Sequence, residues 1–147
     1  LILLQIIWGA FTSGLNAGLL YQTWPLMNEN FIADDITLTK ILTASVLNNP
    51  SYVQLAHRFL AYFIIFYSIV IYFAHFKKSN LKLAFKYIFV ALALQVILGI
   101  LTLISGLNIY LASFHQIGSI LLISSAIYGL FHTNHNQNLI DTSVYKQ

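Results

Sequence analysis

Two histidines lie inside stretches of the chain that are otherwise almost continuously apolar. His57 and His115 each fall about five residues after the start of such a stretch, at 52–75 and 110–132. An ionisable side chain within a membrane-length apolar segment is costly and marks a candidate functional site. A single histidine there could serve only to hydrogen-bond a neighbouring helix, but two at matched depth favour a shared site. The remaining histidines are expected at the opposite surface of the membrane: His75, His132 and His135.

A pair of imidazoles suits haem iron better than the other common metal centres. A structural zinc site takes four ligands, usually cysteine or histidine, whereas this sequence has no cysteine and no carboxylate near the depth of His57 and His115. Haem iron needs only two axial ligands and accepts neutral imidazole. The macrocycle is also apolar and compatible with a lipid-embedded bundle. These two residues therefore predict a bis-histidine haem site, unless both serve only helix packing.

Neighbouring side chains could support such a site. Arg58 follows His57 and is expected either to pair with a haem propionate or to extend to the lipid headgroups. Gln54 and Gln116 are candidates for orienting an imidazole or the haem edge. No Ser-His-Asp set, paired carboxylates or phosphate loop is present, so we assign no catalytic residue. Small residues that would leave room for a macrocycle fall one turn from each histidine: Ala61, Gly118 and Ser119.

The composition indicates that these histidines belong to a membrane protein. The chain of 147 residues is 59% hydrophobic and only 7% charged, whereas soluble domains carry about 25% charged residues. A soluble domain and a disordered chain are both excluded. Nucleic-acid binding is excluded as well, because 7 Lys+Arg against 4 Asp+Glu cannot form an extended basic face.

Four segments are apolar and long enough to cross a bilayer as helices, which takes about 20 residues. The stretch 87–131 has no charged residue and holds two of them. We predict an all-α polytopic membrane protein, a four-helix transmembrane bundle over 1–135, with a polar inner-side tail at 136–147. In an up-and-down bundle the second and fourth helices are diagonal, so His57 and His115 can converge. The predicted helices are 1–20, 52–75, 84–104 and 110–132.

The few charged residues predict how the bundle is oriented. Lysines surround the connection between the second and third helices, which should therefore face the cytoplasm or the matrix. The connection between the first and second helices is acidic and should face outward. Within it, apolar spacing over 36–47 favours a short amphipathic helix on the outer surface, with a solvated loop as the alternative. The lysines are Lys77, Lys78, Lys82 and Lys86, and the acidic residues are Glu29, Asp34 and Asp35.

A short internal repeat links the two halves of the chain. Leu-Gln, three apolar residues and Gly occur at 4–9 and again at 94–99. Each copy is followed by a Ser-Gly pair, an outer connection and a helix with a histidine in its first two turns. This pattern suggests a duplicated helical hairpin, which would place its functional groups symmetrically; a chance match is the alternative.

Several longer runs are more specific than the histidines. They are GAF at 9–11, GLNAG at 14–18, YQTWPLM at 21–27, QLAHRFLAY at 54–62, LQVILGI at 94–100 and HQ at 115–116. Together these runs resemble the haem A synthase family, and the resemblance covers nearly all of 1–135. At Asn16, where that family often has a charged residue, the sequence departs from the pattern.

The resemblance implies a fold of eight transmembrane helices in two related halves, of which this chain resembles the second. The family converts haem O to haem A, for cytochrome oxidase, by oxidising the C8 methyl to a formyl group. The second half is implied to hold haem b, with His57 and His115 as axial ligands. The first half is implied to bind the substrate and to carry a Glu where this chain has Gln54. Because the chain begins without Met inside an apolar segment, we expect the N-terminal half to be missing.

The partners and location implied by the resemblance complete these expectations. They are a lipid membrane, the missing half, haem O, and also haem O synthase and an electron donor. The membrane would be the bacterial cytoplasmic membrane or the mitochondrial inner membrane. Two other functions remain open: a stand-alone bis-histidine b-type cytochrome, and a haem-free membrane assembly subunit.

Overall fold

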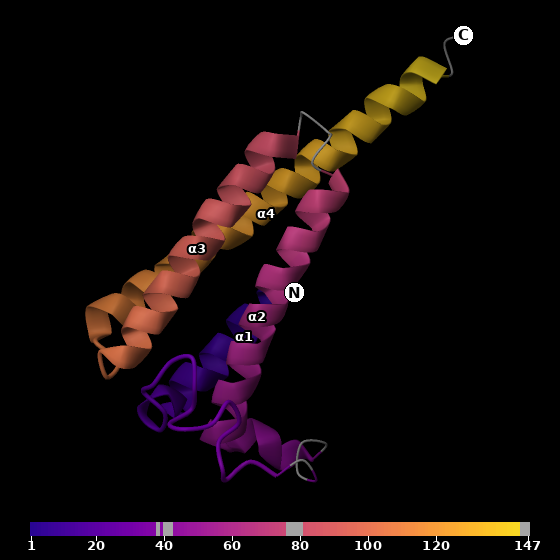
Figure 1. Cartoon of the computed structure of the whole chain (residues 1–147). Helices are drawn as coiled ribbons and strands as arrows, with labels where there is room; N and C mark the ends of the chain where they lie inside the picture. The colour runs from indigo at the N-terminus through magenta and orange to yellow at the C-terminus, as the bar shows by residue number, and fades with distance from the viewer. Residues whose placement is uncertain (38, 40–42, 76–80, 145–147) are drawn as a thin grey trace.

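The computed structural model describes the chain except for residues 38, 40–42, 76–80 and 145–147, and it leaves out the side chains of 44, 45 and 133–144. The described residues form four α-helices and two short 3-10 helices, and no strand (Figure 1). This confirms the predicted all-α fold. The elements are α1 (Ile2–Gly14), η1 (Ala17–Leu19), η3 (Ala44–Asn48), α2 (Pro50–His75), α3 (Lys82–Ile104) and α4 (Ile109–Val144).

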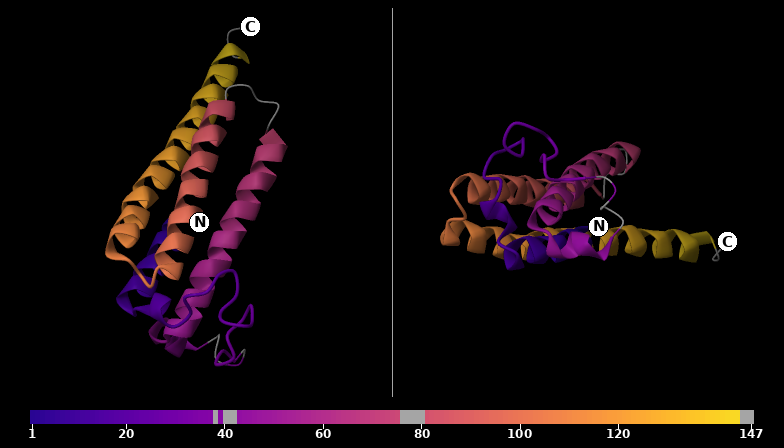
Figure 2. Two further views of the ribbon diagram at one scale, coloured as in Figure 1. Left: turned by 60° about the vertical axis from the view of Figure 1, so that its left-hand side comes forward. Right: turned by 90° about the horizontal axis from the view of Figure 1, so that it is seen from below.

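The helices pair as two hairpins that follow the order of the chain. α1 packs mainly on α2, and α3 packs mainly on α4 along most of its length. The two views of Figure 2 show α3 and α4 running side by side, with α1 at the end of the bundle where the 3–4 turn lies. A small apolar core joins the hairpins through Ile64, Ala91, Leu92 and Leu122.

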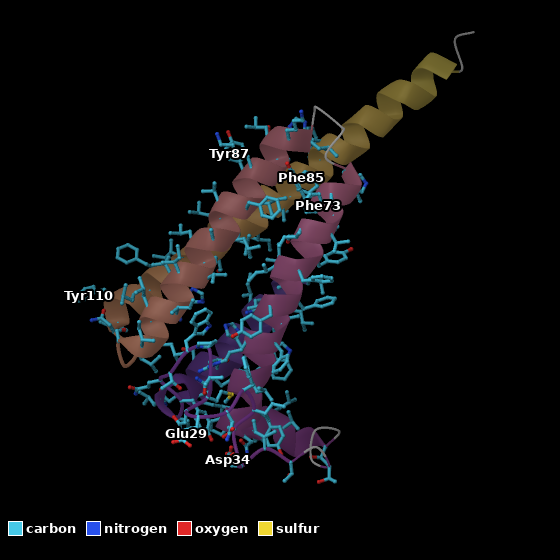
Figure 3. All side chains as sticks on the ribbon, viewed as in Figure 1. Glu29, Asp34, Phe73, Phe85, Tyr87 and Tyr110 are labelled. Carbon is cyan, nitrogen blue, oxygen red and sulfur yellow. The ribbon has the colours of Figure 1, made fainter. Side chains whose placement is uncertain are left out.

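Within the described part of the chain, three helices are long and apolar enough to cross a membrane: α2, α3 and the part of α4 over Ile109–His132. Large apolar side chains on these helices point outward. Phe73 is 66% exposed and Tyr110 is 74% exposed, and Figure 3 shows Tyr110 on the outside of the α3–α4 hairpin. Exposure of this kind over whole helices is expected where lipid is the solvent. The chain is therefore an integral membrane protein with a helical bundle, as predicted.

The first predicted helix, 1–20, is too long. α1 ends at Gly14, and after Leu15 the chain turns at Asn16, whose φ is 50°. Asparagine tolerates this left-handed backbone better than most residues, and glycine is a poor helix former. The thirteen residues of α1 extend over about 20 Å, which is less than the ~30 Å of a hydrocarbon core.

The last helix is longer than the predicted 110–132. α4 continues to Val144 and includes most of the segment predicted only as a polar tail. The sequence after His132 contains neither Gly nor Pro, so nothing local ends the helix. Figure 1 shows this part of α4 projecting beyond the other helices.

The long connection between α1 and α2 covers the end of the bundle opposite the lysines. Figure 3 shows Glu29 and Asp34 there, whereas Lys82 and Lys86 begin α3 at the other end. The predicted amphipathic segment 36–47 lies partly outside the described residues. In its described part, Ile36 and Thr37 are not helical, and Ala44–Asn48 form the short 3-10 helix η3. The sidedness itself stays a prediction.

Asp35 fastens this connection to the start of α2. Its carboxylate accepts hydrogen bonds from the Tyr21 hydroxyl at 2.8 Å and the Ser51 hydroxyl at 2.5 Å. Partial burial alone would raise the pKa of Asp35, but the hydrogen bonds from Ser51 and Tyr21 outweigh it and lower the pKa. Since the folded pKa is lowered, this anchor contributes stability above the ordinary carboxyl pKa and loses it as the pH falls through the lowered value.

We predict that acidification below about pH 4, the ordinary range of an aspartate, loosens the connection between α1 and α2. Hydrogen exchange over 21–37, corrected for the intrinsic effect of pH, should show protection at pH 6 that is lost at pH 3. Asp35→Asn should show the weaker protection at both pH values, because an amide cannot accept both hydrogen bonds as a carboxylate does. A variant as protected as the wild type at pH 6 would contradict the anchor.

Candidate functional site

The structure places His57 on α2 and His115 on α4, both partly buried within the bundle. No group of three or more His, Asp or Glu side chains that could hold a metal ion occurs in the described part of the chain. The two imidazoles therefore come from two different helices, one in each hairpin.

Each imidazole packs against a glycine on the helix that precedes its own. A Cβ atom added to Gly9 would lie 3.2 Å from Cε1 of His57, and one added to Gly99 would lie 3.1 Å from Cε1 of His115. These distances are shorter than ordinary van der Waals contacts, so the absence of a side chain is what lets helix and ring approach. The repeat seen in the sequence thus recurs in space as the same glycine–imidazole contact in both hairpins.

The amide of Gln5 completes the surroundings of His57. Its Nε2 donates to the backbone carbonyl of His57 at 3.1 Å. The same atom lies 3.2 Å from the ring Nδ1 and 3.3 Å from the ring Nε2. Sequence reasoning missed this residue, because nothing local relates α1 to α2. The repeat carried the only signal, since Gln5 and Gln95 each stand four residues before the packing glycine.

In the second hairpin, the glutamine that corresponds to Gln5 is Gln95, and it has different contacts. Gln95 is buried, and its amide nitrogen contacts Gly118, where no side chain could fit without moving it. Neither Gln95 Nε2 nor His115 Nδ1 has a hydrogen-bond partner among the described residues, and both are buried. Buried polar atoms without partners are uncommon. This interior therefore has unused capacity to bind a ligand or water.

Gln54 and Arg58 lie one turn apart on α2 and hold the connection that follows α1. Gln54 Nε2 donates to the carbonyl of Tyr21 at 2.8 Å. Both Nη atoms of Arg58 donate to loop carbonyls, at 3.0–3.4 Å. The acceptors of the four Arg58 bonds are Tyr21, Thr23, Pro25 and Leu26. The guanidinium is buried and does not extend to headgroups.

These bonds correct two interpretations of the sequence and limit a third. Gln54 orients the connection rather than an imidazole. Gln116 is exposed on α4, so it does not orient an imidazole either. Only Nε–H of Arg58 lacks a partner among the described residues, so the predicted contact with a propionate would have to use that donor or displace a loop carbonyl.

The other histidines lie away from this site. Nδ1 of His75, at the end of α2, lies 3.1 Å from the carbonyl of Ile71. The ring of His132 packs edge-to-face on Tyr128, with 4.4 Å between ring centroids. The side chain of His135 lies outside the described residues. His75 and His132 thus occupy the end of the bundle opposite the outer connection.

We predict that Gly99→Val destabilises the protein, because the new side chain collides with His115. Overpacking of this kind costs about 1–3 kcal/mol. Thermal unfolding in detergent should show a lower midpoint for this variant. Gly14→Val is the matched control, since a Cβ at Gly14 meets nothing within 4 Å. Equal midpoints for the two variants would contradict the close packing of glycine and imidazole.

Comparisons with known proteins identify the family of this chain. The family model COX15-CtaA, described as a cytochrome oxidase assembly protein, matches residues 1–127. Heme A synthase of Pelagibacter ubique is 48% identical over 128 residues, which are 85% of this chain and 37% of that protein. Heme A synthase of Wolbachia pipientis wMel is 35% identical over 130 residues, 88% of this chain and 36% of that protein.

A third relative matches a similar share of the chain. Heme A synthase of Bartonella henselae is 38% identical over 122 residues, which are 79% of this chain and 33% of that protein. The chain thus spans little more than a third of the length of these relatives. No solved structure matches it. With a family model matched over nearly its whole length, the chain belongs to the COX15-CtaA family of cytochrome oxidase assembly proteins.

Proposed function

We propose that this chain is the haem-binding half of a haem A synthase, the second of two related four-helix halves. The observation that carries the proposal is the pair of imidazoles, His57 on α2 and His115 on α4, each packed against a glycine of its own hairpin. The relatives named Heme A synthase support it. The whole protein would oxidise the C8 methyl of haem O to a formyl group and so supply haem A for cytochrome oxidase.

The residues present fit haem b. Haem iron takes two axial ligands, and imidazole nitrogen is a common one. His115 Nδ1 is buried without a partner, which leaves a nitrogen lone pair or N–H of the ring unused. The hydroxyl of Tyr62 on α2 is also buried without a partner in the described residues. Two buried polar groups of α2 and α4 are thus left without partners among the described residues, which is compatible with a bound polar or metal-containing group.

The protein groups would then hold the cofactor and set its properties. Gly9 and Gly99 fix the depth of the two rings, because each ring rests on helix backbone. Arg58 and Gln54 keep the outer connection over the same end of α2. When bound, haem b would supply one-electron transfer, with a potential tuned by axial ligation and burial.

The methyl chemistry is assigned to the companion half, which this chain does not contain. A catalytic carboxylate would be needed at the position of Gln54, and an amide cannot act as a general base. The structure gives Gln54 another task, since its amide nitrogen donates to the carbonyl of Tyr21. Accordingly, haem O, the N-terminal half, haem O synthase and an electron donor are proposed partners of the whole protein.

The location follows from the same proposal. The membrane would be the bacterial cytoplasmic membrane or the mitochondrial inner membrane. The lysines at the start of α3 would face the cytoplasm or the matrix. The site formed by His57 and His115 would then lie in the outer half of the bilayer, beneath the connection between α1 and α2.

We predict that His57→Ala and His115→Ala each lose b-type haem. Removal of a residue that hydrogen-bonds a metal ligand already lowers the affinity for the metal about 10- to 100-fold. Removal of the ligand itself should lower the affinity for haem at least as much. The measurement is the reduced-minus-oxidised difference spectrum of the protein purified from membranes. His75→Ala is the control, because His75 lies at the far end of α2 and should leave the spectrum unchanged.

Two outcomes would contradict the proposed function. One is a wild-type protein without low-spin b-type bands. The other is a pair of variants that keep the wild-type haem content. Either result would favour the haem-free assembly subunit, in which both histidines serve only packing. A stand-alone cytochrome would instead show the bands without a companion half encoded upstream.

A further inference from the structure

We propose that Gln5 is a positioning residue for His57: its side-chain amide hydrogen-bonds the ring nitrogen that does not bind iron. This inference rests on the proposed function, since it takes His57 as a haem ligand. It assigns a task to α1, a helix that carries no ligand of its own. Gln5 is 52 residues from His57 in the chain, and their contact joins the two helices of the first hairpin.

The position of the amide supports this task. Gln5 Nε2 lies 3.2 Å and 3.3 Å from the two ring nitrogens of His57. It also donates to the backbone carbonyl of His57 at 3.1 Å, so the amide is held beside the residue whose ring it contacts. Gly9, one turn further along α1, packs closely against Cε1 of the same ring. Backbone and amide of α1 therefore fix His57 from two adjacent points.

A ligating imidazole commonly has a partner of this kind. When one ring nitrogen binds a metal, the other carries the proton and commonly donates it to an acceptor, which fixes the ring and raises its basicity. Gln5 Oε1 is buried and has no hydrogen-bond partner in the described residues. A half-turn of the amide about its last side-chain bond exchanges Nε2 and Oε1 and presents this oxygen to the ring N–H. The bond from Nε2 to the backbone carbonyl of His57 is given up in that orientation.

The neighbours of Gln5 are less suited to the task. Arg58 has only donors, and both of its Nη atoms are occupied by loop carbonyls. The amide nitrogen of Gln54 is held by the carbonyl of Tyr21. In the second hairpin, His115 Nδ1 has no partner among the described residues, and Gln95 turns its amide nitrogen to Gly118. The surroundings of the two proposed ligands therefore differ.

The test compares Gln5→Leu with Gln5→Glu in the haem-loaded protein. Gln5→Leu has no acceptor, so the affinity for haem should fall about 10- to 100-fold and the midpoint potential should rise. Gln5→Glu keeps an acceptor, so it should retain the wild-type affinity and lower the potential. Gln116→Leu is the matched control: the same change on an exposed face of α4 should alter neither quantity.

The outcomes separate this inference from the proposed function. If His57→Ala loses haem but Gln5→Leu keeps the wild-type affinity and potential, the positioning role is wrong and the proposed function stands. If Gln5→Leu and Gln5→Glu lose affinity equally and leave the potential unchanged, Gln5 acts through packing alone and the inference is overturned. If His57→Ala retains its haem, the proposed function fails first.

Discussion

The close contact between a glycine and an imidazole is the constraint on which the rest of the structure depends. Gly9 meets His57 and Gly99 meets His115, at nearly the same distance. A membrane interior offers little hydrophobic drive for helix association, so helices approach where small residues permit it. Here the small residue also decides where a polar ring can lie. One contact therefore both packs the two helices of each hairpin and positions its histidine.

The outer connection depends on the face of α2 that adjoins His57. Gln54 and Arg58 donate to carbonyls of the segment 21–26, and Asp35 accepts from Tyr21 and Ser51. Each buried donor thus replaces water that the loop carbonyls would otherwise need. The position that the resemblance links to catalysis in the companion half has here become structural. This role of Gln54 fits the proposed haem-binding half, in which the oxidation would belong to the companion half.

The sequence predicted the long helices and the two histidines, because apolar length and isolated polar groups are local signals. It did not predict the end of α1, which depends on the left-handed backbone at Asn16. It also selected Gln54 and missed Gln5, since closeness along a helix is visible in a sequence whereas a contact across 52 residues is not. The partners of Arg58 could not be predicted either, because they are carbonyls of a connection whose sequence has no helical or strand periodicity.

The central claim is that His57 and His115 bind one haem iron together. The electron paramagnetic resonance spectrum of the oxidised protein, recorded at low temperature, tests it most directly because the signal reports both axial ligands at once. A shared haem site predicts a low-spin ferric signal typical of two imidazoles in the wild type, and predicts that this signal is lost when either histidine is exchanged for alanine. A wild-type spectrum that is high-spin, or that persists unchanged in either variant, would contradict it.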